Sequence, residues 1–146
     1  MLKIRKMVNE DIADMATLEE QIFSDAWSEC ALADSFRQEH SLIYVVEVKG
    51  HIEGYCILYY VLEEAEIVRI AVSEDMRRQG VGDSLLSTMW EWCHQQGITR
   101  ITLEVRENNH TAIRLYQKHE FASCAIRKAY YTCPVEDGII MAKVLL

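Results

Sequence analysis

The alternation of hydrophobic and polar residues divides the chain into short segments of two kinds. Residues 2–7 alternate with a period of two, which is typical of a half-buried strand. Residues 12–22 carry apolar side chains at helical spacing, and Asn9 stands where a helix N-cap is expected. Ser28 is placed to cap a second short helix. The first part of the chain therefore predicts a strand followed by two helices.

Three further runs have strand character and cover residues 42–48, 52–61 and 66–72. The turn at residues 48–51 predicts a hairpin between the first two. A helix with one apolar stripe follows and ends at Gly97. The last elements are a strand over residues 101–106, a short helix capped by Asn108 or Asn109, and strands over residues 121–129 and 139–144.

The predicted order is β-α-α-β-β-β-α-β-α-β-β, an α/β fold in which helices pack on one mixed sheet. The chain has 146 residues, half of them hydrophobic, with six glycines and one proline. This length and composition predict one globular domain over residues 1–146. No repeat or linker divides it.

The net charge and the cysteines indicate the cell compartment and the kind of partner. The five cysteines are an odd number and scattered, which indicates reduced thiols in the cytoplasm. No signal peptide is recognisable, and no apolar stretch approaches the roughly 20 residues needed to cross a bilayer. The formal net charge of −8 disfavours naked nucleic acid and favours a cationic partner. We expect a cytoplasmic protein without a membrane or nucleic-acid partner.

A glycine-containing loop between a strand and a helix is the first candidate for chemistry. It consists of Arg77, Arg78, Gln79, Gly80, Val81 and Gly82. Backbone N–H groups at a helix start bind anions, glycines allow close approach, and the arginines add positive charge. A P-loop would need a lysine where Asp83 stands, and Leu85 replaces the third glycine of the dinucleotide fingerprint. The missing lysine argues against ATP or GTP as the ligand, and the incomplete fingerprint leaves a nucleotide-dependent oxidoreductase only as a remote alternative.

Residues 77–82 match the Q/R-x-x-G-x-G/A loop of GNAT acetyltransferases, and the chain resembles that family in its order of elements as well. The resemblance implies that these residues hold the pyrophosphate of acetyl-CoA. It also implies that the preceding strand end, Ile70, Ala71 and Val72, pairs its backbone with the pantetheine arm and the acetyl group. No metal is implied.

The chain resembles the RimI family of ribosomal-protein-alanine N-acetyltransferases, most clearly in its second half. The shared segments are residues 103–106, Asn109 and residues 112–116, with further similarity at residues 23–28, 62–65, 127–131 and 139–142. The resemblance implies Glu104 as general base, Tyr116 as general acid and Asn109 as a pantetheine contact. It implies an N-terminal alanine as acceptor, on the eighteenth protein of the small ribosomal subunit. We expect Phe23 and Trp27 on one side, and Tyr130 and Tyr131 on the other, to form walls for this peptide end.

The implied roles agree with the chemistry of an α-amine. With a pKa of about 7.8, such an amine is ~14% neutral at pH 7, whereas a lysine is only ~0.04% neutral. Deprotonation costs about 1 kcal/mol for the α-amine and nearly 5 kcal/mol for lysine. One alternative is a GNAT enzyme that acetylates a small amine or a lysine side chain. Another is a non-catalytic acyl-CoA sensor, which would not need Glu104 and Tyr116.

Two residues depart from the family pattern. Asp83 follows the second glycine, where many relatives have a basic residue, so we expect weaker binding of CoA. The segment His119-Glu120-Phe121 lacks the glycine that usually follows the tyrosine helix. The end of that helix is therefore poorly defined by the sequence.

Overall fold

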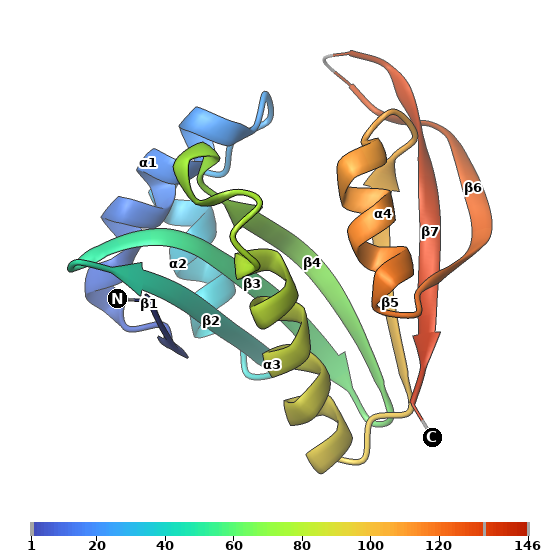
Figure 1. Cartoon of the computed structure of the whole chain (residues 1–146), viewed down its shortest axis with the longest axis horizontal. Coiled ribbons are helices and arrows are strands. Elements are labelled where there is room, and N and C mark those ends of the chain that lie inside the picture. The colour runs from blue at the N-terminus through green and yellow to red at the C-terminus, as the bar shows by residue number, and fades with distance from the viewer. Residues whose placement is uncertain (1, 133, 146) are drawn as a thin grey trace.

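Seven strands form one mixed sheet in the computed structural model, which describes residues 2–132 and 134–145 (Figure 1). The strands are β1 (Leu2–Lys6), β2 (Ser41–Val48), β3 (His51–Val61), β4 (Glu64–Val72), β5 (Arg100–Arg106), β6 (Ala122–Tyr131) and β7 (Glu136–Val144). Their order across the sheet is β1-β2-β3-β4-β5-β7-β6. Neighbours are antiparallel except β4 and β5, which are parallel.

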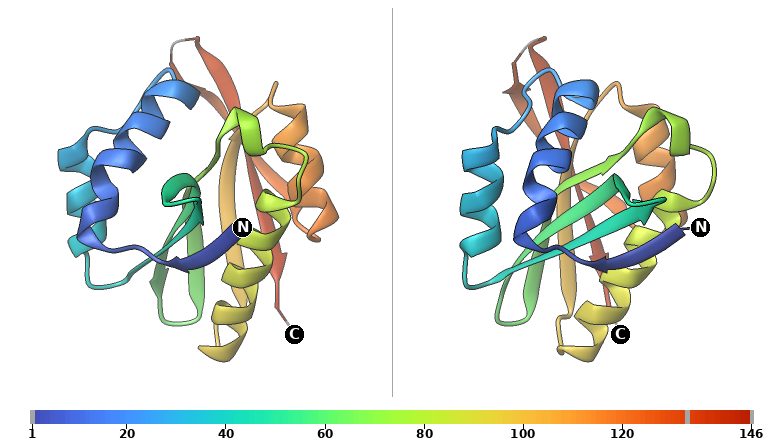
Figure 2. Two further views of the ribbon diagram at one scale, coloured as in Figure 1. Left: turned by 60° about the vertical axis from the view of Figure 1, so that its left-hand side comes forward. Right: turned by 90° about the vertical axis from the view of Figure 1, so that its left-hand side faces the viewer.

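Helices cover both faces of the sheet (Figure 2). The first two, α1 (Ile12–Ile22) and α2 (Glu29–Arg37), lie on one face, and α3 (Val81–Gln95) and α4 (His110–Lys118) lie on the other. Short 3-10 turns at Asn9–Asp11 and Glu74–Met76 precede α1 and α3. The order of elements expected from the sequence is confirmed. Among the described residues, no helix combines the length and apolar character needed to span a bilayer.

Each face of the sheet has its own buried cluster because neighbouring strand residues point in opposite directions. Val45 and Tyr55 are fully buried in the cluster beneath α1 and α2. Their chain neighbours Val46 and Cys56 are fully buried in the cluster beneath α3 and α4. Strands buried on both faces read as continuous apolar runs, which explains the sequence of β2 and β3.

The parallel pairing of β4 and β5 is short. Glu64–Ile67 of β4 pairs with Arg100–Leu103 of β5, and the pairing stops there. Farther along, β4 stays paired with β3 up to Val72, and β5 stays paired with β7 up to Arg106. The two strands diverge beyond this point, so the sheet opens between its two halves (Figure 1).

The helix starts agree with the sequence in two of three cases. Ser28 accepts a hydrogen bond from the Ala31 N–H at the start of α2, and Asn109 rather than Asn108 caps α4. The expected cap at Asn9 is wrong, because Asn9 belongs to the 3-10 turn before α1. The Asp11 carboxylate instead accepts the Val8 N–H at 2.8 Å and forms an ion pair with Arg5.

The carboxyl end of α4 is well defined despite the missing glycine. The Phe121 N–H donates to the Tyr116 carbonyl, and the Glu120 N–H donates to the Gln117 carbonyl, both at 3.0 Å. These two bonds make a Schellman motif, and the Tyr116 and Phe121 rings supply its hydrophobic contact. The motif places Glu120 at φ 70°, in the left-handed region that favours glycine.

We expect Glu120→Gly to raise the free energy of unfolding by about 0.5–1 kcal/mol. A left-handed backbone conformation costs an L-residue roughly 1–2 kcal/mol, and glycine removes this cost. Part of the stabilisation is lost again, because glycine gives the unfolded chain more conformational freedom. Thermal or urea unfolding measures the change. Gln117→Gly is the matched control within α4, where glycine should destabilise by about 1 kcal/mol. Destabilisation by Glu120→Gly would contradict the argument.

Candidate active site

The loop that joins the end of β4 to α3 offers exposed backbone beside two arginines. Residues 77–80 are exposed, and α3 begins at Val81. The Ser84 N–H donates to the Gly80 carbonyl at 3.0 Å, which is the first bond of the helix. The N–H groups at residues 81–83 precede that bond and have no partner within the helix. The loop and the helix dipole can therefore hold an anion.

The two glycines of this loop have different physical roles. Gly80 is the N-cap of α3 with φ 78°, a conformation that side chains with a Cβ adopt at a cost. Gly82 lies against α4, and a Cβ at this position would be 3.0 Å from the Leu115 Cδ2 atom. Gly80 thus shapes the loop, and Gly82 allows α3 and α4 to approach.

Asp83 is less of an obstacle to an anionic ligand than the sequence indicates. Its Oδ1 atom lies 2.8 Å from the Nε2 atom of His119 and 3.2 Å from the Nζ atom of Lys118. The hydrogen bond with His119 is the main cause that lowers the pKa of Asp83. Residues at the end of α4 therefore counter the charge that Asp83 adds to the first turn of α3.

The end of β4 presents one edge to the region where the sheet opens. Ile70, Ala71 and Val72 pair with β3 on one side, through Cys56, Tyr55 and Gly54. Their other edge faces the diverging strand β5 and lies beyond the β4–β5 pairing. Such an edge carries backbone donors and acceptors that an extended ligand can use.

Glu104 lies on β5 just past the last residue paired with β4. Its side chain is 15% exposed, and Oε1 is 3.4 Å from the Nε atom of Arg127. Its Oε2 atom is buried and has no hydrogen-bond partner among the described residues. A buried carboxylate oxygen without a partner is costly, so a donor group from a ligand or water would be stabilised here.

Tyr130 and Tyr131 lie beside Glu104. A hydrogen bond with Glu104 is the main cause that raises the pKa of Tyr130 above its ordinary value. Burial, followed by the charge of Glu104, raises the pKa of Tyr131 to about 12. The two rings meet edge to face with their centroids 4.9 Å apart. A Cβ at Gly138 would be 3.2 Å from ring carbons of both tyrosines, so glycine leaves room for the pair.

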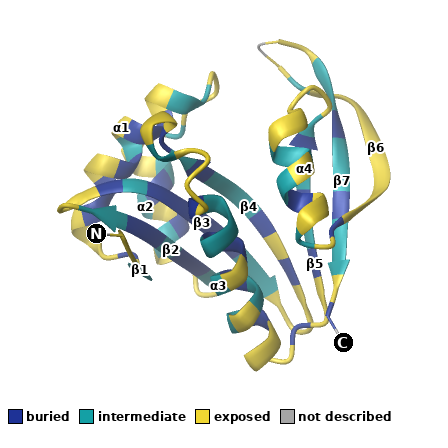
Figure 3. Ribbon diagram, in the orientation of Figure 1, coloured by how far each residue is buried: buried dark blue, intermediate teal, exposed yellow. Residues whose placement is uncertain are grey.

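The tyrosines belong to a strand, which continues past residue 129, where the sequence predicts its end. They end β6, which is exposed over nearly its whole length (Figure 3). The β6–β7 register shifts between Arg127 and Tyr131, and Ala129 has φ 49° within this irregularity. Arg106 of β5 donates to the Thr132 carbonyl at 2.9 Å and lies 4.5 Å from the Tyr131 ring centroid. The strand end is therefore tied to β5.

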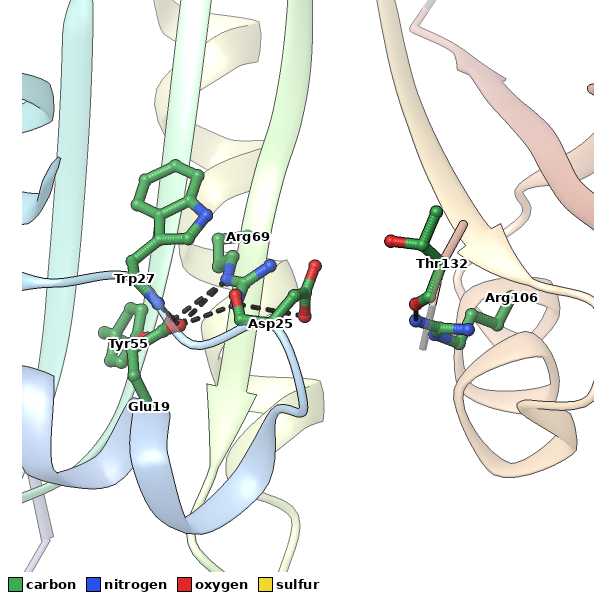
Figure 4. A network of polar contacts seen from close by, with 7 residues as sticks. All are labelled: Glu19, Asp25, Trp27, Tyr55, Arg69, Arg106 and Thr132. Atoms are coloured by element: carbon green, nitrogen blue, oxygen red, sulfur yellow. Dashed lines mark hydrogen bonds and ion pairs between the residues drawn. The ribbon is translucent and has the colours of Figure 1, made fainter. Parts of the chain in front are cut away.

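Phe23 and Trp27 lie on the opposite side of the opening, in the loop between α1 and α2. Both are half-buried against the α1 and α2 cluster. The guanidinium of Arg69 lies 3.9 Å from the Phe23 ring centroid and 5.1 Å from that of Trp27. Glu19 of α1 accepts hydrogen bonds from Arg69 and from the Trp27 N–H (Figure 4). The two rings therefore pack against the helix pair and also border the opening.

Tyr116 lies on α4 in the buried cluster of the other sheet face. Burial is the main cause that raises its pKa well above the ordinary range, followed by Cys56 and Tyr131. Glu104 points to the opposite face of β5, because its neighbours Leu103 and Val105 face that cluster. Glu104 and Tyr116 therefore flank the opening from opposite faces of the sheet.

Asn109 has its side-chain oxygen engaged in capping α4, where it accepts the Ala112 N–H at 3.2 Å. The residue is exposed at the end of the β5–α4 turn. Its amide nitrogen is the part that can donate to a ligand.

Four charged residues that shape the site carry no role in the sequence analysis: Glu19, Arg69, Arg106 and Arg127. Two of them leave a signal in the sequence. Glu19 stands on the apolar stripe of α1, and Arg69 interrupts the apolar run of β4. Buried charges require partners, so these positions indicate a buried ion pair. Among residues 2–132 and 134–145, no group of three or more His, Cys, Asp or Glu side chains is arranged to hold a metal ion.

Comparison with known proteins places this geometry in a family. Residues 12–121 match the model of the Acetyltransferase (GNAT) family. The chain is 33% identical over 144 residues to the ribosomal protein bS18-alanine N-acetyltransferase of Escherichia coli (strain K12), covering 97% of each chain. It is 36% identical over 143 residues to a Bacillus subtilis (strain 168) protein to which that activity is provisionally assigned, covering 94% of this chain and 92% of the relative.

Solved structures agree with the sequence comparison. The crystal structure of the ribosomal-protein-S18-alanine N-acetyltransferase from Escherichia coli superposes with a TM-score of 0.92 at 33% identity, covering 99% of this chain and 94% of that chain. The crystal structure of Ard1 from Thermoplasma volcanium also superposes with a TM-score of 0.92, at 28% identity, and the match covers 99% of this chain and 98% of that chain. The family model spans most of the chain, and the relatives match it almost end to end. The chain belongs to the GNAT family of acetyltransferases.

Proposed function

We propose that this protein transfers the acetyl group of acetyl-CoA to the free N-terminal α-amine of a ribosomal protein, with alanine as first residue and the bS18 protein as acceptor. The observation that carries the proposal is the buried Oε2 atom of Glu104, which has no hydrogen-bond partner in the described part of the chain and lies where β4 and β5 diverge. An acceptor ammonium or a bridging water would satisfy it. The names of the Escherichia coli relatives support the choice of acceptor.

The residues present fit acetyl-CoA as the acetyl donor. The pyrophosphate would lie at residues 77–82, where α3 begins beside Arg77 and Arg78. The pantetheine arm would run along the outer edge of residues 70–72, where the Val72 carbonyl accepts a hydrogen bond from Arg77 at 3.2 Å. Asn109 would be a further donor. The acetyl group would then reach the opening between Glu104 and Tyr116.

Glu104 would act as the general base. At pH 7 an α-amine is mostly protonated, and the carboxylate takes the proton that must leave before nitrogen attacks the thioester carbon. Once the nitrogen has bonded to the thioester carbon, it loses its second proton to solvent, and the C–S bond breaks to leave the amide and the CoA thiolate. Tyr116 would give its hydroxyl proton to the departing thiolate. Burial raises the pKa of Tyr116, which keeps the hydroxyl protonated at neutral pH but also makes it a weaker acid, in agreement with a small role. A thiol pKa of about 8.5 makes the thiolate a tolerable leaving group, so this second role is the smaller one.

The surroundings favour a basic acceptor. Asp25, 52% exposed, lies in the loop that carries Phe23 and Trp27, and its charge contributes to the raised pKa of Tyr131 across the opening. Glu66 is exposed on β4 and shares the face of Glu104. These carboxylates and the net charge of −8 attract the cationic N-terminus of a ribosomal protein. The described cysteines are all free thiols, which supports a cytoplasmic reaction.

We expect Gly80→Val to weaken acetyl-CoA binding about tenfold. A β-branched residue at positive φ carries roughly 1–2 kcal/mol of strain, which the loop relieves by leaving its anion-binding conformation. Isothermal titration calorimetry measures the dissociation constant. Gly50→Val is the matched control, because Gly50 also has positive φ but lies in the β2–β3 hairpin. Equal affinities in the two folded variants would remove the loop from the acetyl-CoA site.

The acceptor is tested with a short peptide that begins with alanine and continues with basic residues. Mass spectrometry should show one added acetyl group on the α-amine. The same peptide with a blocked N-terminus should stay unmodified, because its remaining amines are lysine side chains. Faster acetylation of lysine peptides or of polyamines would identify a GNAT enzyme of a different acceptor class.

We expect Glu104→Gln to lower kcat/KM about 10²–10⁴-fold at pH 7 while acetyl-CoA binding is unchanged. Higher pH should partly restore the rate, because more of the α-amine is then neutral. Steady-state kinetics between pH 6.5 and about 9 measure both effects.

Glu66→Gln is the control for Glu104→Gln, since it removes a carboxylate from the same face one strand away. Its kcat should stay within a few-fold of wild type, because Glu66 attracts the acceptor but does not take its proton. Tyr116→Phe, which keeps the buried ring, should lower kcat less than Glu104→Gln does. Loss of activity in Glu66→Gln with a normal rate in Glu104→Gln would assign the base to β4.

A further inference from the structure

A buried ion pair links the two parts of the chain that would bind the two substrates. Glu19 of α1 is fully buried, and Arg69 of β4 has 12% of its side chain exposed. The Nη2 atom of Arg69 lies 2.6 Å from Oε1 of Glu19, and Nε lies 3.0 Å from Oε2. The Tyr55 hydroxyl also donates to the Glu19 carboxylate. This pair is distinct from Glu104 and Tyr116.

The same pair reaches into the loop of residues 23–28, hereafter the acceptor loop. Glu19 accepts the Trp27 N–H at 2.8 Å, and Arg69 donates to the Asp25 carbonyl at 3.2 Å. The guanidinium also packs over the rings of Phe23 and Trp27. Figure 4 shows Trp27 and Arg69 both bonded to Glu19, with Asp25 beside Arg69. One cation thus touches the backbone and both large side chains of the acceptor loop.

Arg69 stands directly before residues 70–72, the strand end assigned to acetyl-CoA. Its own backbone is fixed because it pairs with Ile57 of β3. Loss of the side chain would therefore release the acceptor loop but leave the strand in place.

We propose that Arg69 is a positioning residue that orders the acceptor loop, so that Phe23 and Trp27 form a ready wall for the incoming peptide. The inference rests on the proposed function for the identity of the acceptor. Arg69 acts through the loop and does not touch the reacting atoms. Its removal should raise the KM for the peptide and leave acetyl-CoA affinity and kcat at saturation nearly unchanged.

The first test is Arg69→Gln, with the alanine-first peptide as acceptor. A loop that is ordered a tenth of the time binds about tenfold more weakly, so we expect KM to rise about tenfold or more. We expect kcat to change less than about threefold. Amide hydrogen exchange should become faster in residues 23–28, and calorimetry should give a wild-type dissociation constant for acetyl-CoA.

The matched control is Arg5→Gln, which removes the cation of a second partly buried network. Arg5 lies 2.8 Å from Asp11, which is 7% exposed on its side chain, and 2.8 Å from Glu47. This network holds β1 and the start of α1, away from the acceptor loop. Arg5→Gln should lower the melting temperature while the peptide KM and the exchange of residues 23–28 stay at wild-type values.

Two further variants separate positioning from stability. Arg69→Lys keeps a positive charge for Glu19 but loses the planar guanidinium that packs over two rings. Its melting temperature should recover toward wild type while its KM stays raised. If Arg69→Gln does not fold because Glu19 is left as an unpaired buried charge, Glu19→Gln combined with Arg69→Gln removes both charges and takes its place.

A wild-type peptide KM together with wild-type exchange in residues 23–28 of a folded Arg69→Gln variant would overturn the inference. An equal rise of KM in Arg5→Gln would overturn it too, because the effect would then be general destabilisation. If the wild-type enzyme leaves the peptide unmodified, the proposed function fails separately. Hydrogen exchange and acetyl-CoA affinity of Arg69→Gln then decide whether Arg69 orders the loop.

Discussion

The short parallel contact between β4 and β5 is the constraint on which the rest of the site depends. Four residues of each strand pair, and each strand then stays with its antiparallel neighbour while the two halves of the sheet separate. Backbone N–H and C=O groups on the two inner edges are left for another partner. An extended pantetheine arm can supply one, and Glu104 and Tyr116, the proposed base and acid, lie beside the same opening on opposite faces. In the proposed function, binding and chemistry therefore share one structural origin.

Arginines fix the positions of aromatic residues on both sides of this opening. Arg69 joins Glu19 to the rings of Phe23 and Trp27, and Arg106 joins Glu136 and the Thr132 carbonyl to the ring of Tyr131. Buried ion pairs add little net stability, because desolvation offsets their attraction, but breaking one costs about 3–5 kcal/mol. The effect of these ion pairs is to fix the positions of the aromatic rings beside the opening. A planar guanidinium suits this task, since it can donate in its plane and pack on aromatic rings with its faces.

Much of the fold was predictable because its causes are local. Period-two and helical spacing gave the order of elements, and caps such as Ser28 and Asn109 act within one turn. The expected elements differ from the structure where a residue interacts with a partner from another element of the fold. Asp11, paired with Arg5, displaced Asn9 from the expected cap. Pairing with β7 and the contacts of Arg106 extended β6 through Tyr130 and Tyr131. The helix α4 ends at a defined point although Glu120 stands in place of glycine, because the Schellman hydrogen bonds and the Tyr116–Phe121 contact fix that end.

The sequence by itself determined the elements, the glycine loop at the start of α3, and the positions of Glu104 and Tyr116 on a strand and the following helix. These features depend on neighbours a few residues away. Tertiary structure alone decided where β4 and β5 separate, that Glu104 keeps a buried oxygen without a partner among the described residues, and that His119 and Lys118 counter the charge of Asp83. It also decided that Arg69 pairs with Glu19, 50 positions away. Pairing and burial of charges depend on side chains that meet only when the chain folds, so a local pattern can show a charge at an apolar position but not the partner that it meets.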